Sequence, residues 1–396
     1  MAVMNGRTTT AAGVFAGALF AFAVGPPAAG QAWHQRLTAY PTKFYTIYTD
    51  LPVETAREAA ARMTAMAREY QRRTENFPRK VHGAMRFYLF SRAEDYRAAG
   101  GTPGSAGMYN GERLMALADP RRGEAVWRIV QHEGFHQYMH KVVTRRLLPW
   151  VDEGLAEYFG EAVWTGDAFV VGGIPRRRLE QVRQLIKSRG LLPFERMLGM
   201  TLTQWNADLS GRNYAQAWAM VHFLIHADDG RYRKAFDLYI DDIALRNMPW
   251  KKAFVLRFGR DLAGFERRFA DWWASLPDDP TAGLETLGAV QTLTSFLGRA
   301  VAQGQRFAST AEFFRAAREG RLKQHASQWL PPSLLGKALK GAEKRGMWSL
   351  DASGRWPRLV LETRHKRYTG TFAVRGAAAG AFDIVEEDLQ PTTRAE

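Results

Sequence analysis

The feature that most constrains this chain is the segment Gln131–Gln137, which contains the pattern His-Glu-x-x-His. On an α-helix, His132 and His136 project from one face about one turn apart. Two neutral ring nitrogens so placed can bind one Zn²⁺. Glu133 stands beside the first histidine, where its carboxylate can act as general base for a water molecule that the metal activates. Apolar side chains at positions 126, 129 and 130 predict a helix that leads into the motif.

A catalytic zinc site has three protein ligands and one open position, so the pattern needs a third ligand. The metzincin pattern requires a histidine where this chain has Val142. Glu153 follows His136 by 17 residues and opens a second helical pattern, Glu153-x-x-x-Glu157. A helix returning beside the first can direct Glu153 at the metal, with Glu157 orienting a ligating imidazole. Acidic residues at i and i+4 repel each other mildly, which favours a shared site over a solvated face. The alternative is a core helix with incidental histidines.

Together the two motifs resemble the gluzincins, zinc metallopeptidases with two His and one Glu as ligands. The run Asp-Glu-Gly-Leu-Ala at 152–156 is similar to the Asn-Glu-Gly-Phe-Ala run of the aminopeptidase branch. It is closer to secreted bacterial peptidase MA-like metallohydrolases, in which a Pro-Trp pair precedes the glutamate, as Pro149-Trp150 does here. The resemblance covers roughly residues 43–275. It implies His132, His136 and Glu153 as zinc ligands and Glu133 as the base.

The motif departs from the family pattern at Gly134, because glycine is a poor residue for a helix interior. The interval from the His-Glu-x-x-His motif to Glu153 is also slightly shorter than the corresponding interval in the aminopeptidases. Neither departure removes a functional group.

The resemblance also implies an oxyanion donor. Aminopeptidase-type gluzincins carry a helix-opening tyrosine at a similar distance to that of Tyr214, which lies 61 residues after Glu153. A phenol directed at developing charge stabilises a transition state; the alternative is a packed tyrosine whose hydroxyl serves as a cap. His222 and His226 are also spaced i, i+4, but no glutamate signature surrounds them, so we expect core or surface histidines. For His140 we expect a supporting or exposed role.

Periodicity predicts an α+β fold with a small N-terminal sheet, a helix that carries the motif and a helical second half. The resemblance implies that these elements form a zincin-type metallopeptidase core. We expect strands at 43–49, 84–90 and 113–118, a helix at 53–71, and mostly helices over 175–275. The strand at 113–118 has two interpretations. It is either the edge strand that pairs with extended substrate in gluzincins, or an ordinary inner strand.

A Pro/Asp-rich break at 275–282 predicts the end of the catalytic domain, which we expect to span 33–277. Residues 283–389 form a smaller C-terminal extension, with helices over 285–345 and three short strands over 347–375. A polar tail, 390–396, follows. The sequence predicts no function for this last third.

Residues 1–32 are typical of a secretory signal peptide: the only charge before Gly30 is Arg7, and an apolar stretch runs from Ala11 to Val24. The apolar run is shorter than the roughly 18–20 residues of a spanning helix, which favours a cleaved signal peptide. An uncleaved membrane anchor is the alternative. We expect an exported protein, periplasmic or secreted. The chain has no cysteine, which excludes a disulfide scaffold and leaves histidines and carboxylates to bind any zinc.

The formal net charge of +15 favours anionic envelope surfaces or acidic substrates. No nucleic-acid motif interleaves with the basic residues, so we expect no nucleic-acid partner. Twelve Trp and thirteen Tyr offer stacking surfaces for glycans. The competing function is therefore a non-catalytic envelope- or glycan-binding module, although such a module has no need of Glu133.

The expected substrate is a peptide or protein. Aminopeptidases bind the free amine through acidic groups upstream of the motif, and in the Gly-rich stretch 104–112 only Glu112 resembles one. Endopeptidase action is therefore slightly favoured.

Overall fold

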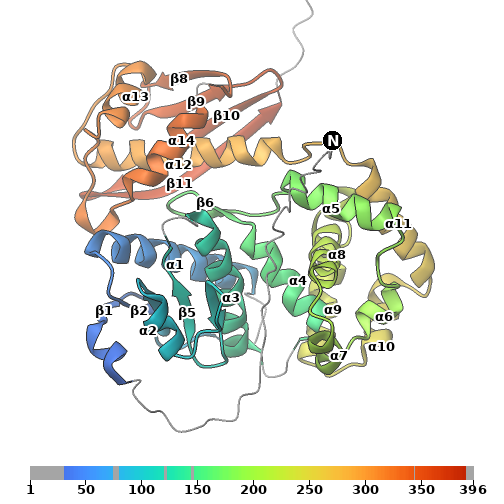
Figure 1. Ribbon diagram of the computed structural model, residues 1–396. Coiled ribbons are helices and arrows are strands. Elements are labelled where there is room, and N and C mark those ends of the chain that lie inside the picture. Colours follow the sequence, from blue (N-terminus) through green and yellow to red (C-terminus); the bar gives the residue numbers. More distant parts are fainter. Residues whose placement is uncertain (1–30, 75–79, 120–122, 144–146, 343, 389–396) are drawn as a thin grey trace, which may run out of the picture.

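The computed structural model describes residues 31–74, 80–119, 123–143, 147–342 and 344–388 (Figure 1). The predicted signal segment and the polar tail lie outside these residues, apart from 31–32 of the former. The chain mixes helices with several small sheets, so the α+β class expected from the sequence is confirmed. A search of the described helices finds none with the length and hydropathy needed to cross a membrane.

The N-terminal sheet has five strands in the order β1–β2–β3–β5–β4. Its bounds are β1 Thr38–Pro41, β2 Tyr45–Thr49, β3 Met85–Phe90, β4 Gly107–Tyr109 and β5 Leu114–Leu117. The inner strands β2, β3 and β5 are parallel, and the outer strands β1 and β4 are antiparallel to their neighbours. Parallel strands need helical crossovers that cover the faces of the sheet. Side chains of α1 (Val53–Arg73) and α3 (Glu124–Val142) share the larger core with one face. The other face packs with α2 (Ala93–Ala98) and η1 (Gln31–Arg36).

The edge-strand interpretation of residues 113–118 is wrong, because β5 lies between β3 and β4. The edge strand is β4, which the sequence concealed within a Gly-rich stretch, where three residues give no detectable alternation. The residues on either side of β4 are hydrogen-bonded toward β5: Ala106 O accepts from Leu117 N, and Asn110 N donates to Arg113 O. Along an antiparallel strand, every second residue is hydrogen-bonded to the partner strand. The backbone groups of Gly107 and Tyr109 therefore face the open side of the sheet.

The second half of the core is helical, as expected for 175–275. It contains α4 Pro149–Gly160, α5 Arg176–Lys187, α6 Phe194–Leu198, α7 Leu202–Ala207, α8 Gly211–Gly230, α9 Arg233–Ala244, α10 Trp250–Phe258 and α11 Leu262–Ser275. Helix α4 begins at Pro149 and not at Glu153, because proline suits the first helical position, where no N–H is needed. Helix α4 packs against both α3 and α8.

The C-terminal third contains α12 Ala282–Ala302, α13 Thr310–Arg318 and α14 Pro332–Ala342, followed by a sheet in the order β11–β10–β9–β8. Its strands are β8 Met347–Asp351, β9 Arg358–Glu362, β10 Lys366–Arg375 and β11 Ala378–Asp388, so one strand more than expected is present. Helix α12 packs on this sheet. Leu293 and Phe296 of α12 belong to the same hydrophobic cluster as the N-terminal core. The division into domains near residue 277 stays a prediction.

Gly154 allows the close approach of α4 and α8. A Cβ at this position would lie 2.6 Å from the backbone oxygen of Ala217 and 2.7 Å from Cγ2 of Val221. Backbone atoms cannot move aside as a flexible side chain can, so the two helices must separate to admit even a methyl group.

We expect Gly154→Ala to lower the free energy of unfolding by about 1–3 kcal/mol, although alanine is the better helix former. Urea unfolding followed by circular dichroism measures it. Gly211→Ala on α8 is the control, because a Cβ there meets no atom within 4 Å. Equal stability of the two variants would contradict a tight α4–α8 contact.

Candidate metal centre

Three side chains from two helices converge at one point between α3 and α4. Nε2 of His132 lies 3.2 Å from Nε2 of His136. Oε2 of Glu153 lies 3.3 Å from the first nitrogen and 3.5 Å from the second. The structure thus brings together the three ligands predicted from the sequence, and in the described residues they form a group able to hold a metal ion.

The triangle has the dimensions of a small tetrahedral ion's ligand set. Ligands about 2.0–2.1 Å from a tetrahedral centre lie about 3.3–3.4 Å from one another. Oε2 of Glu153 is buried and has no hydrogen-bond partner in the structure, although a buried carboxylate oxygen normally has one. The donor set of two imidazoles and one carboxylate is one that Zn²⁺ accepts. The residues therefore fit a zinc ion.

A second carboxylate supports each imidazole from behind. Nδ1 of His132 lies 3.4 Å from Oε1 of Glu157, and Nδ1 of His136 lies 3.3 Å from Oδ1 of Asp152. Such contacts fix the ring orientation and tautomer of a ligating histidine. Glu157 occupies the place expected from the sequence. Asp152 was missed, although its position directly before Glu153 could have been considered as a signal.

The electrostatics of the cluster favour a cation. Burial would lower the pKa of His136, but the charges of Asp152 and Glu153 raise it well above its ordinary value. Burial would raise the pKa of Glu153, but the charge of His136 and the nearby ring nitrogens of both histidines lower it to about 2. Each histidine is drawn toward its charged form by the surrounding carboxylates, and a bound cation satisfies the same field.

Arg178 of α5 compensates part of this negative charge. Its buried guanidinium donates to Glu157, and its Nε donates to Oε1 of Glu161 at 3.1 Å. The guanidinium carbon also lies 5.4 Å from the centre of the Trp218 ring. This ion pair offsets part of the cost of burying the Glu157 side chain. In the sequence, Arg178 stands in a run of three arginines, 176–178, which gives no signal for this contact.

Glu133 lies beside the metal ligands and is itself buried. Its Oε2 accepts a hydrogen bond from the backbone N–H of Tyr109 at 2.9 Å. Burial raises the pKa of Glu133, against the charges of His132 and His136 and the Tyr109 hydrogen bond, which lower it. A carboxylate with a raised pKa accepts and returns protons more readily at neutral pH. The hydrogen bond also connects the candidate base to edge strand β4.

Polar contacts set the spacing between α3 and α4. The side-chain amide of Gln131 donates to the carbonyl oxygens of Phe159 at 2.9 Å and Ala162 at 3.0 Å, where the end of a helix leaves carbonyls unpaired. The hydroxyl of Tyr70 donates to the backbone oxygen of Gln131. These contacts determine how far Glu153 stands from the two histidines. None follows from the motif alone.

Tyr214 lies in the first turn of α8, is buried, and contacts the ring of Trp205. Burial raises its pKa, and the charge of Glu153 raises it further. The role of Tyr214 as an oxyanion donor stays a prediction.

The other histidines lie outside the cluster. His140 contacts the Tyr109 hydroxyl through Nδ1 at 3.3 Å. The buried His222 contacts the carbonyl oxygen of Gly172, and His226 contacts the Tyr158 hydroxyl, both at 3.0 Å. Glu112 is exposed on the β4–β5 turn and lies 3.6 Å from Arg113.

A family model described as "Protein of unknown function (DUF1570)" matches residues 127–246. The matched segment covers α3 from Trp127 onward, α4 and α8. Of the residues named above around the candidate site, it leaves out Tyr70, Tyr109, Glu112 and Arg113. A comparison with curated proteins found no match.

We expect Asp152→Ala to weaken zinc binding by about 10–100-fold, since the orienting partner of His136 is lost. Competition with a chromogenic chelator measures the affinity. Glu180→Ala is the control, because Glu180 pairs only with Arg176 on the exposed face of α5. An unchanged affinity in Asp152→Ala would show that His136 needs no orienting carboxylate.

Proposed function

We propose that this protein is an exported zinc metallopeptidase with a zincin-type core and a gluzincin site. The observation that carries the proposal is the triangle of His132, His136 and Glu153 with the buried carboxylate of Glu133 beside it. A structural zinc site has no use for such a base, whereas a hydrolytic site does. The signal-like segment supports export, and an N-terminal membrane anchor is the alternative.

Zinc in this site would act as a Lewis acid toward the scissile carbonyl and would make a water molecule more acidic. Glu133 takes the proton from that water and gives it to the leaving amine. The N–H of Tyr109 holds Oε2 of Glu133, so the carboxylate keeps one orientation through both transfers. Asp152 and Glu157 keep the two imidazoles in place. Tyr214 donates its hydroxyl proton toward the developing oxyanion.

Edge strand β4 is the proposed binding surface for the substrate backbone. The backbone groups of Gly107 and Tyr109 face the open side of the sheet, and the Tyr109 N–H is already at Glu133. An extended peptide that pairs with this edge is placed next to the base by β-augmentation. Pairing with extended substrate, which was one of the two interpretations of residues 113–118, is thus proposed for residues 107–109 instead.

We favour endopeptidase action. An aminopeptidase needs an acidic group that binds the free amine, and Glu112 is exposed and next to Arg113. Attraction to anionic envelope surfaces remains a proposal from the net charge of +15.

The first test is Glu133→Gln, which should keep one zinc per chain and lose at least about 10²–10⁴-fold in peptide hydrolysis. The assay is a peptide library, half of it N-acetylated, read by mass spectrometry alongside elemental analysis. Glu195→Gln, at an exposed carboxylate that pairs with Lys251, should hydrolyse like the wild type. Chelation should abolish wild-type hydrolysis, and added zinc should restore it.

Three results would contradict the proposal. Hydrolysis by Glu133→Gln at the wild-type rate would remove Glu133 from the mechanism. Less than about half a zinc per chain, with no rescue by added zinc, would favour the non-catalytic envelope- or glycan-binding module. Strictly sequential trimming that acetylation blocks would replace endopeptidase by aminopeptidase action and return attention to Glu112.

Tyr214→Phe should lower kcat by about 10–100-fold with little change in KM, because the lost hydroxyl acts only in the transition state. Steady-state kinetics on one cleaved peptide separates the two constants. Tyr239→Phe on α9 is the matched control, since Tyr239 is equally buried. A rise in KM without a fall in kcat would give Tyr214 a role in substrate binding only.

A further inference from the structure

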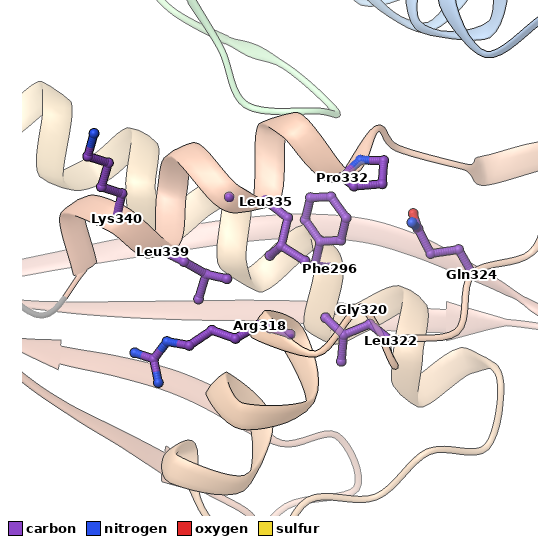
Figure 2. Close-up of a pocket in the computed structure, with 11 residues that line it drawn as sticks. Phe296, Arg318, Gly320, Leu322, Gln324, Pro332, Leu335, Leu339 and Lys340 are labelled. Atoms are coloured by element: carbon purple, nitrogen blue, oxygen red, sulfur yellow. The ribbon is translucent and has the colours of Figure 1, made fainter.

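A second cavity lies in the C-terminal third, outside the metal centre. It measures about 590 Å³ and lies between α12, α13, α14 and the loop that joins α13 to α14. Phe296, Leu335 and Leu339 are buried side chains in its wall, and Leu322 adds a half-buried one (Figure 2). A cavity of this size is in the range of small-molecule sites. No residue of the metal centre lines it.

The charges of the cavity gather at one end. Figure 2 shows Arg318 and Lys340 on the same side, with Leu339 near them, and Gln324 on the opposite side. The segment 310–342 as a whole carries six basic and two acidic side chains. One of the acids, Glu319, is paired with Arg321. The field at the charged end is therefore positive and suits one anionic group.

At the other end, the side chain of Gln324 is already paired with the backbone of the protein itself. The side-chain amide of Gln324 donates to the carbonyl oxygen of Leu330 at 3.0 Å and accepts from Leu330 N–H at 2.8 Å. A bound peptide would bury its own N–H and C=O groups against the apolar wall without partners, which costs free energy for each group. A hydrocarbon chain has no such groups, so the wall suits it better.

We propose that this cavity binds a single-chain fatty carboxylate. The carboxylate lies at the end of the cavity that carries Arg318 and Lys340, and the hydrocarbon chain runs along Leu339, Leu335 and Phe296 toward Gln324. The site is independent of the proposed peptidase chemistry. It assigns a ligand to the C-terminal third, and it assigns the binding of that ligand's carboxylate to the positive charges of Arg318 and Lys340.

The first experiment is calorimetric titration of the full chain with dodecanoate below its micelle concentration. We expect saturable binding of one dodecanoate per chain, with a negative heat-capacity change from apolar burial. Dodecanol and butanoate should each bind at least tenfold more weakly, because one lacks the charge and the other lacks the chain.

Gly336→Leu blocks the cavity without disturbing the core. Gly336 lines the cavity from α14, and a Cβ there meets no atom within 4 Å. Leucine is also a better helix former than glycine, so the variant should unfold at the wild-type temperature or above. Dodecanoate binding should fall at least tenfold.

The charged end is tested with Arg318→Gln and Lys340→Gln, each of which should weaken binding about two- to fivefold. Lys337→Gln is the matched control, because Lys337 is on the same helix, is 60% exposed, lies near Glu124 and does not line the cavity. Its affinity should equal that of the wild type.

Several results would overturn the proposal. They are no saturable binding of dodecanoate by the wild type, equal binding by a folded Gly336→Leu, and equally tight binding of dodecanol. Stronger binding of an N-acetylated apolar peptide than of dodecanoate, lost in Gly336→Leu, would assign the cavity to a peptide partner and would also overturn it.

Discussion

The buried charges between α3 and α4 are the constraint on which the geometry of the candidate metal centre depends. Four carboxylates, those of Glu133, Asp152, Glu153 and Glu157, lie around two imidazoles, and three of the four are buried. A buried charge without compensation costs several kcal/mol. Compensation for Glu133 comes from strand β4 through a backbone N–H, and for Glu157 from helix α5 through Arg178. Oε2 of Glu153 is buried and lies 3.3 and 3.5 Å from the two imidazole nitrogens, and it faces the point where the proposed cation binds.

Close packing of the helices fixes the positions of these charged side chains relative to one another. The absence of a side chain at Gly154 lets α4 approach α8, and Gln131 ties α3 to the end of α4. Gly134, which departs from the family pattern, has a related reason. A Cβ there would lie 2.7 Å from Cε of Met66 on α1. Because Cε is the end of a flexible side chain that can move aside, this contact requires a glycine less strictly than the backbone contact at Gly154 does.

The sequence predicted the parts of the site that are local, and the rest depends on how helices meet. His132, Glu133 and His136 follow from a four-residue spacing on one helix, and the inner strands β2, β3 and β5 follow from strong apolar patterns. Arg178 could not be assigned, because its contact with Glu157 spans 21 residues and needs the turn between α4 and α5. Strand β4 was missed because three residues carry no period. Of the two interpretations of residues 113–118, the inner strand is the correct one.

The C-terminal third is connected to the metal centre through the short hairpin that follows α4. This hairpin, β6 Val163–Trp164 and β7 Phe169–Val170, begins three residues after α4 ends. The buried Arg299 of α12 donates two hydrogen bonds to Asp167 in its turn, at 2.6 and 2.9 Å.

From the other side of the hairpin, the guanidinium carbon of Arg62 on α1 lies 4.5 Å from the centre of the Trp164 ring. Side chains of α12 and α1 therefore both contact the hairpin that follows α4. Because the contact between Asp167 and Arg299 spans 132 residues, no local sequence pattern reveals it. It links the last third of the chain to the segment that follows α4, the helix that carries Glu153.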